Sequence, residues 1–342
     1  MADDTLAPPE IRRRNQDRSP VSVDTLWHDG TLPALVRANV PGTDLAAWIG
    51  AHRAEVERLG HEAGAVLFRG FAVDDADDFE RVMTILANGG LPYGERSSPR
   101  SEVIPGIYTS TEHPADQPIV LHNEQSYTTD WPLHIVFHCH TEPTQGGRTP
   151  LADSRRVLAR LRPETVAEFE RRGVRYVRNY VPGLSLAWQE AFGTESREEV
   201  EAYGRRADIA VEWIGEDQLR TSQVRPAVRQ HPVTGVRTWF NHALFFHATS
   251  LPAEVRDGLL SALDEADLPY HTYYGDGGRI EEPVLAELRA AYEAEARSFA
   301  WRQGDVLMVE NMLAAHGREP FEGPRRILTA MATPFSTLES RI

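Results

Sequence analysis

The sequence predicts a mainly β protein with peripheral helices, of the double-stranded β-helix or jelly-roll class. Short apolar runs with the alternation of strands recur along the chain, and Pro and Gly residues separate them. Few helical patterns lie between these runs, which favours two packed antiparallel sheets over a parallel βαβ arrangement. The 342 residues contain no internal repeat and no low-complexity segment. We therefore expect a single jelly-roll domain over residues 1–342.

Helical and strand-like patterns together place the expected elements along the chain. An N-terminal helical segment covers about residues 43–90, with a buried strand at 64–71 between two helical patterns. Inserted helical and loop excursions are expected at about 154–208 and 250–297. Further strand-like runs are expected at 133–139, 174–180, 209–214, 237–240, 297–302, 305–311 and 325–332.

Composition and charge exclude several classes of function. The formal net charge is −15, which argues against binding to nucleic acid or to an anionic membrane surface. The chain lacks an N-terminal signal-like apolar region and any apolar run of about 18 residues, so we expect a cytoplasmic protein without a membrane span. Cys139 is the single cysteine, which excludes an intrachain disulfide framework and a Cys-rich zinc module. Lysine is absent, which excludes a lysine Schiff base and a P-loop lysine.

The stretch IVLHNEQSY places two possible metal ligands one residue apart. In a strand, residues two apart point to the same face, so His122 and Glu124 can converge on one ion. An H-x-E triplet is also common by chance, and two polar residues on the wet face of a strand are an alternative interpretation. A metal site needs a third ligand.

Several histidines compete for that role. The segment LHIVFHCH holds His134, His138 and His140 on one strand face, without a neighbouring carboxylate there and with an apolar opposite face. An amphipathic strand explains this pattern. His242 and His247 in WFNHALFFH either line a pocket or pack among phenylalanines.

His316 is the better candidate for the third ligand. It follows the strand-like run GDVLMVEN and precedes a Gly-Pro turn and a strand that opens with Arg325 and Arg326. A histidine near buried arginine is electrostatically unfavourable unless an anion lies between them. A metal-bound dicarboxylate is such an anion.

These motifs together resemble the iron(II)/2-oxoglutarate-dependent dioxygenases of the taurine dioxygenase (TauD/TfdA) superfamily, most closely its clavaminate-synthase-like and syringomycin-hydroxylase-like branch. The resemblance covers about residues 64–334. The matching segments are VLFRGF, YTSTEHPADQPIVLHNEQSY, GGRTPLAD, WFNHALFFH, YGDG and GDVLMVENMLAAHGREPFEGPRRILTAM.

The resemblance implies that His122, Glu124 and His316 bind Fe(II), with 2-oxoglutarate and O2 as cosubstrates. Two imidazoles and one carboxylate on one face of the ion form the facial triad suited to non-haem iron with open positions. Glu124 stands where taurine dioxygenase has Asp. Halogenating relatives lack this carboxylate, so its presence favours oxygen transfer.

By similarity, Arg326 and Thr149 bind the distal carboxylate of 2-oxoglutarate, because the planar guanidinium suits bidentate recognition of a carboxylate. Arg325 is expected to be a solvated arginine at the start of a strand. Taurine dioxygenase has a second arginine that binds the substrate sulfonate, and Ala330 occupies that place here. A sulfonate substrate is therefore not expected.

The resemblance also implies a substrate class. We expect Tyr108, Ser110, Thr111 and Asn241 to line the substrate site. The expected reaction is hydroxylation of an aliphatic C–H bond in an amino acid or amino-acid-derived substrate of specialised, antibiotic-like biosynthesis. Alternatives are an aminoacyl group tethered to an acyl or peptidyl carrier protein, and a desaturation or cyclisation outcome. Remote alternatives are a zinc hydrolase and a non-catalytic jelly-roll binding protein.

Overall fold

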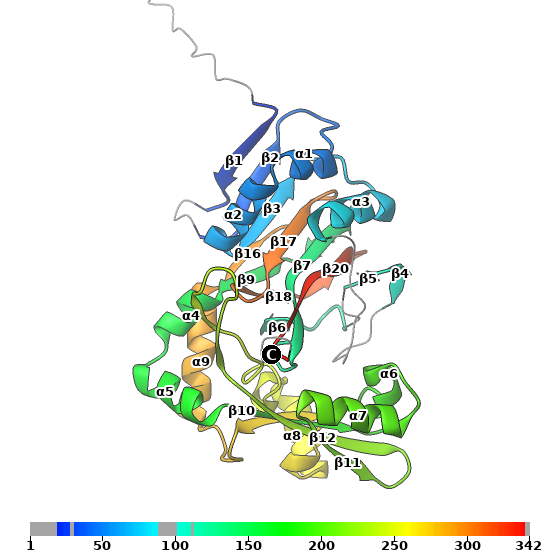
Figure 1. Cartoon of the computed structure of the whole chain (residues 1–342), viewed down its shortest axis with the longest axis vertical. Coiled ribbons are helices and arrows are strands. Elements are labelled where there is room, and N and C mark those ends of the chain that lie inside the picture. Colours follow the sequence, from blue (N-terminus) through cyan, green and yellow to red (C-terminus); the bar gives the residue numbers. More distant parts are fainter. Residues whose placement is uncertain (1–18, 28–30, 88–100, 111–112, 339–342) are drawn as a thin grey trace, which may run out of the picture.

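The largest sheet has eight strands in the order β1-β2-β3-β17-β7-β20-β5-β4 (Figure 1). The structure is a computed structural model that describes residues 19–27, 31–87, 101–110 and 113–338. Strand pairing in this sheet is antiparallel except between β2 and β3. Its strands are β1 Val21–Thr25, β2 Ala34–Ala38, β3 Ala65–Arg69, β4 Glu102–Ile104, β5 Ile107–Thr109, β7 Asp130–Thr141, β17 Val306–Glu310 and β20 Arg326–Ser336.

A smaller sheet in the order β16-β9-β18-β6 packs against the inner face of the large sheet. One buried cluster joins them, with Leu67, Ile135 and Leu307 from the large sheet and Leu151 and Phe299 from the smaller one. Two sheets packed in this way confirm the predicted jelly roll. The strands of the smaller sheet are β6 Ile119–His122, β9 Thr149–Asp153, β16 Arg297–Phe299 and β18 Ala314–Arg318.

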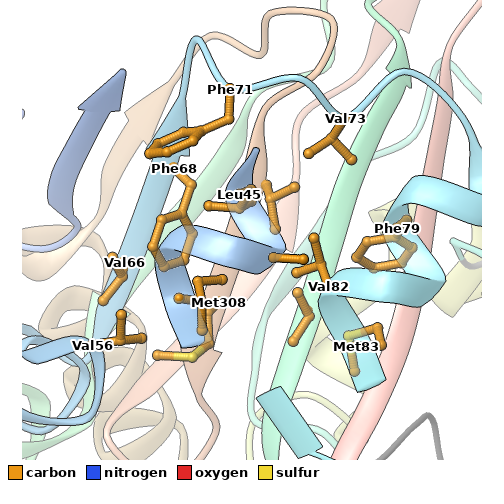
Figure 2. Packing of buried hydrophobic residues seen from close by; sticks show 14 of the residues in the cluster. Leu45, Val56, Val66, Phe68, Phe71, Val73, Phe79, Val82, Met83 and Met308 are labelled. Atoms are coloured by element: carbon orange, nitrogen blue, oxygen red, sulfur yellow. The ribbon is translucent and has the colours of Figure 1, made fainter. Parts of the chain in front are cut away.

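Three helices cover the outer face of the large sheet: α1 Leu45–Ala51, α2 Arg53–Ala63 and α3 Ala76–Ala87 (Figure 1). Alternate residues of β3 point to opposite faces, so Val66 and Phe68 pack against these helices while Leu67 points inward. Figure 2 shows this cluster, in which Val56 and Phe79 come from the helices. The cluster fixes the large sheet on which the smaller sheet rests.

The rest of the chain builds a third layer of structure around the sheet β11-β12-β10-β15. Its strands are β10 Val174–Tyr180, β11 Ala210–Ile214, β12 Gln218–Arg225 and β15 Tyr270–Tyr274. The remaining helices are α4 Ser154–Arg160, α5 Pro163–Arg172, α6 Trp188–Phe192, α7 Arg197–Ala207, α8 Ala253–Ala262 and α9 Glu282–Glu295. Two-stranded pairs join β13 Val228–Gln230 with β14 Arg237–Trp239, and β8 Gln145–Gly146 with β19 Phe321–Glu322.

Most predicted elements are present, with local differences. The helical pattern expected before the strand at 64–71 divides at His52, which leaves helical geometry with φ −124° and ψ 25°. The first helical part of the excursion expected at 154–208 divides before Pro163, because the residue before a proline is driven to extended geometry. The excursions at 154–208 and 250–297 contain strands, β10 and β15, that pair with each other. None of the helices in the described ranges has the length and apolar composition needed to cross a membrane.

Candidate active site

Two strands of the smaller sheet carry the predicted histidine ligands. His122 lies directly opposite His316 in the β6–β18 pair, and their ring centroids are 4.5 Å apart. Glu124 is buried in the turn after β6, which ends at His122. One ligand atom from each of these three side chains lies within 4.8 Å of the other two. The structure therefore brings the three predicted ligands together, although a turn, not strand alternation, places the carboxylate.

The hydrogen bond of His122 indicates which of its ring nitrogens is available to a metal ion. Its Nδ1 lies 3.0 Å from the carbonyl oxygen of Val120. A carbonyl only accepts hydrogen bonds, so Nδ1 carries the proton of the neutral ring and Nε2 presents a lone pair. Metal-binding histidines are usually oriented by a hydrogen bond of this kind. The donor set therefore fits a divalent cation, and its two imidazoles and one carboxylate suit iron(II).

A second cluster has the same composition but the opposite hydrogen-bonding pattern. His61, His231 and Glu310 also bring their ligand atoms within 4.8 Å of one another. The Nδ1 atom of His231 accepts hydrogen bonds from the backbone N–H groups of Val233, at 3.3 Å, and Thr234, at 3.1 Å. The proton of the neutral ring is therefore on Nε2, which points at Glu310 from 3.9 Å. Because Nε2 of His231 carries the proton, this atom has no lone pair to offer to a metal ion.

The histidines of β7 take no part in the triad. His134 donates from Nε2 to Glu310 at 2.9 Å, so it does have a neighbouring carboxylate, contrary to the sequence-based expectation. Glu310 was not foreseen there because it comes from β17, which pairs with β7. His138 is buried, hydrogen-bonds the carbonyl of Val73 at 3.0 Å and stacks on Phe79 of α3. On this strand face His138 is buried beneath α3, whereas His134 and His140 are partly exposed.

A narrow pocket beside His122 and His316 contains Thr149, Ser110 and Arg325. Arg326 is exposed, so the structure does not bring this predicted cosubstrate ligand into the site. The reason is strand parity: Arg325 shares a face with Ile327, which also lines the pocket, and Arg326 lies on the opposite face. We therefore assign the proposed cosubstrate role to Arg325 in place of Arg326.

The same parity changes the interpretation of Ala330. Its side chain lies in the cluster between the large sheet and the helices, so it faces away from the site. The inward-facing neighbour is Thr329, which pairs with Phe137 of the pocket wall. Neither Thr329 nor Ala330 is an arginine. The chain therefore lacks the sulfonate-binding arginine at this place, whichever of the two residues faces the site.

The pocket has a strong local positive charge. Arg318 and Arg325 both line it, and no carboxylate among the described residues does. Burial, and then the positive charge of Arg318, lower the pKa of Arg325 to about 10, so it remains charged at neutral pH. Thr149 accepts a hydrogen bond from the Trp301 indole at 2.9 Å, which leaves its own hydroxyl proton available to an anion. These groups fit the carboxylate of a dicarboxylic cosubstrate.

A second cavity, of about 350 Å³, also borders the triad, and His122 and Glu124 line its wall. Phe245, Phe246 and Tyr270 make most of its aromatic lining. The Phe245 ring lies 4.5 Å from the ring of His122, measured between centroids. A cavity with aromatic walls beside a predicted iron ligand is suited to holding a C–H bond and excluding water.

Of the residues predicted to line the substrate site, the three that the structure describes do not line the aromatic cavity. Ser110 lines the basic pocket, and Tyr108 is buried in the cluster between the two sheets. Asn241 is buried, donates to the carbonyl of Ala227 at 2.9 Å and accepts from the N–H of Ala243 at 2.8 Å, so it stabilises a turn. Thr111 lies outside the described residues.

The aromatic cavity residues were missed, although the run WFNHALFFH contains two of them. In this run His242 is buried, its Nδ1 lies 2.5 Å from the Ser126 hydroxyl, and burial lowers its pKa well below the ordinary value. His247 accepts from the N–H of Thr249 at the start of a short 3-10 helix. His242 therefore packs in the interior, and His247 caps the short helix. Phe245 and Phe246, which lie between them in the sequence, line the cavity.

A family model described as taurine catabolism dioxygenase TauD, TfdA family, matches residues 29–331. The chain belongs to this family. The dapdiamide synthesis protein DdaC of Enterobacter agglomerans is 41% identical over 301 residues, which cover 88% of this chain and 91% of DdaC. A clavaminate synthase-like protein of Arabidopsis thaliana is 29% identical over 286 residues, covering 81% of this chain and 83% of the relative.

Solved structures agree on the fold of this TauD-family member. PvcB from Pseudomonas aeruginosa matches with a TM-score of 0.56 at 17% identity, covering 92% of each chain. AAD-2 in complex with Mn(II) and N-oxalylglycine matches with a TM-score of 0.52 at 15% identity, covering 91% of this chain and 96% of AAD-2. At these identities the likeness shows the fold, and it confirms the jelly roll.

Membership in the TauD family establishes the class of enzyme. The protein is an iron(II)- and 2-oxoglutarate-dependent dioxygenase, and O2 is its oxidant. The expected cofactors are therefore confirmed. Iron(II) bound with 2-oxoglutarate supplies the activation of O2, and the protein supplies the positions of the reacting groups.

Proposed function

We propose that this dioxygenase hydroxylates an aliphatic C–H bond in an amino acid or amino-acid-derived substrate of specialised biosynthesis. In the balanced reaction, 2-oxoglutarate, O2 and the substrate R–H give succinate, CO2 and R–OH. The observation that carries the proposal is the presence of two chemically different spaces beside His122: a basic pocket and an aromatic cavity.

The basic pocket suits the cosubstrate. We assign the distal carboxylate of 2-oxoglutarate to the guanidinium of Arg325 and the hydroxyl of Thr149, because a charged fork and an oriented hydroxyl both donate to an anion. Arg318 donates to the backbone carbonyls of His113, Pro114 and Gln117, so it adds positive charge while it holds the adjacent segment. His122, Glu124 and His316 are the proposed iron ligands.

The aromatic cavity suits the substrate. Its walls beside Glu124 include Phe245, Phe246 and Tyr270, which keep water from the reacting C–H bond, while Gln117 and Ser250 also line the cavity and offer polar groups to the substrate. Holding that bond beside the iron turns an intermolecular encounter into a positioned reaction, which contributes to the rate.

The relatives support the biosynthetic setting. DdaC, at 41% identity, carries the name of a dapdiamide synthesis protein, and PvcB is described as an oxygenase from an isonitrile synthetic pathway. Glu124 supplies the carboxylate that halogenating relatives lack and hydroxylases have. These points favour oxygen transfer to a small substrate.

The test incubates the iron-loaded enzyme, 2-oxoglutarate and O2 with a panel of free amino acids and short peptides, and separately with aminoacyl carrier proteins. We expect a free compound to gain the mass of one oxygen atom, with one succinate formed for each product. Glu124→Ala serves as the inactive control. A product that has lost two hydrogen atoms would show desaturation or cyclisation in place of hydroxylation. Product found only on the carrier proteins would overturn the proposal that the substrate is a free compound.

A further inference from the structure

Asn311 occupies the turn between the strand β17 and the strand that carries His316. Its side chain is fully buried and hydrogen-bonds both the backbone N–H and the backbone carbonyl of Glu124. The Oδ1 atom accepts a hydrogen bond from the Glu124 N–H at 2.7 Å. The Nδ2 group donates to the carbonyl of Glu124 at 2.9 Å and to the carbonyl of Pro132 at 2.9 Å. One amide therefore replaces the hydrogen bonds that a neighbouring strand would provide.

The backbone of Asn311 binds the same segment. Its carbonyl accepts from the side chain of Asn123 at 2.6 Å, and its N–H donates to the carbonyl of Leu133 at 2.8 Å. Every polar group of this residue is used, on Asn123, Glu124, Pro132 or Leu133. Such a set of bonds fixes position as well as contributing stability.

Glu124 needs such support because it lies beyond the end of β6. The next residue, Gln125, has a left-handed backbone with φ 53°, so the chain turns sharply directly after the carboxylate ligand. His122 is fixed by its pairing with β18, but that ladder does not extend to Glu124. The Asn311 amide supplies the missing backbone partners.

We propose that Asn311 is a positioning residue of the metal centre: by fixing the backbone of Glu124, it sets the carboxylate against the imidazoles of His122 and His316. The same turn leads into β18, so Asn311 joins the segment of the first two ligands to the segment of the third. The inference rests on the proposed ligand roles of these residues and is independent of the substrate.

The experiment measures Mn(II) binding, in the presence of 2-oxoglutarate, by the full-length wild type, Asn311→Ala and a matched control. The control is Asn179→Ala, because Asn179 is buried and its amide donates to the carbonyls of Ala266 and Leu268 at 2.8 and 2.7 Å, away from the triad. Thermal unfolding is measured on all three proteins. We expect both variants to lose stability, and only Asn311→Ala to bind Mn(II) more weakly, by about tenfold or more.

Two further variants keep the test decisive. Asn311→Asp keeps the size and the acceptor for the Glu124 N–H but loses the donors, so it is used if Asn311→Ala does not fold, and it should also weaken Mn(II) binding. Glu124→Ala tests the ligand assignment separately, and wild-type Mn(II) affinity in that variant would overturn the ligand set and the proposal with it. Wild-type Mn(II) affinity in a folded Asn311 variant would show that Asn311 does not position the carboxylate of Glu124, and would overturn the proposal alone.

Discussion

At the scale of single residues, the Nδ1 partner of a histidine separates two clusters that have the same composition. The His122 ring faces a carbonyl through Nδ1, whereas the His231 ring faces two N–H groups. A neutral imidazole has one proton, so these partners leave a lone pair on Nε2 of His122 and a proton on Nε2 of His231. Only the first arrangement suits a metal ion.

This difference predicts one metal ion per chain. Glu124→Ala and His316→Ala should lose bound iron, because each removes one of three ligands, whereas His231→Ala should keep it. The prediction is checked by loading each protein with iron anaerobically, desalting it and measuring its metal content by elemental mass spectrometry. Two ions in the wild type, or loss of iron from His231→Ala, would show that the second cluster binds metal.

Arg325 and Arg326 form a matched pair for testing the cosubstrate site, because they differ in orientation and not in charge. Arg325→Ala should weaken 2-oxoglutarate binding by roughly 30-fold, which corresponds to about 2 kcal/mol for a charge-assisted hydrogen bond. Arg326→Ala removes an exposed side chain and should change the dissociation constant little. Calorimetric titration of the Mn(II)-loaded protein measures both, and the reverse order would return the role to Arg326.

At the scale of elements, Glu310 joins β17 to neighbouring segments of the chain. Burial alone would raise the pKa of Glu310, but the hydrogen bond from His134 and the interactions with His231 and His61 outweigh it and lower the pKa from 4.5 to about 2. Because the folded value is depressed, the stabilisation is fully present above pH 4.5 and is lost as the pH falls towards 2.

The corresponding prediction compares Glu310→Gln with the wild type. The difference in free energy of unfolding should be largest near neutral pH and should shrink by about 1 kcal/mol between about pH 6 and pH 4, as the unfolded carboxyl takes up its proton. Urea denaturation across this range measures the difference. A difference that does not change with pH would contradict the depressed pKa.

Gly317 allows β18 to approach β6 closely. A Cβ atom at this position would lie 2.5 Å from the carbonyl oxygen of Ile119, a backbone atom that cannot rotate away. Gly317→Ala should therefore push β18 from β6, separate His316 from His122 and lower both metal affinity and melting temperature.

Gly258→Ala in α8 is the matched control for Gly317→Ala, since a Cβ there meets nothing within 4 Å. Alanine favours helix over glycine, so this variant should be as stable as the wild type or slightly more stable. Equal metal affinity in the two glycine variants would show that the close approach of β18 to β6 is not needed.

The sequence was sufficient for the jelly roll and for three side chains that the fold brings together, His122, Glu124 and His316, because strand alternation and short motifs marked them. Strand alternation marked β3, β7, β17 and β20, and the H-x-E triplet with a distant histidine marked the triad. The choice between Arg325 and Arg326 depended on the parity of one strand, and the position of Glu310 beside His134 depended on the pairing of strands far apart in the sequence. β12 was missed because its buried positions include the polar residues Thr221 and Gln223.

At the scale of the whole molecule, the charge of the protein and the charge of its cosubstrate have the same sign. The net charge is −15, which repels a dianion at long range, but fields from exposed charges are screened within about 8 Å at physiological ionic strength. Inside the pocket, Arg318 and Arg325 dominate. We therefore expect cosubstrate binding to depend on the local groups of β18 and of the segment just before β20, close to the triad.

The central claim is that His122, Glu124 and His316 hold one iron(II) to which 2-oxoglutarate binds from the Arg325 pocket. The most direct measurement is anaerobic addition of Fe(II) and 2-oxoglutarate to the apoprotein, followed by visible absorption. We predict a weak charge-transfer band that requires both additions, saturates at one iron per chain and is absent from Glu124→Ala. A wild-type protein without this band, or a Glu124→Ala variant that retains it, would contradict the claim.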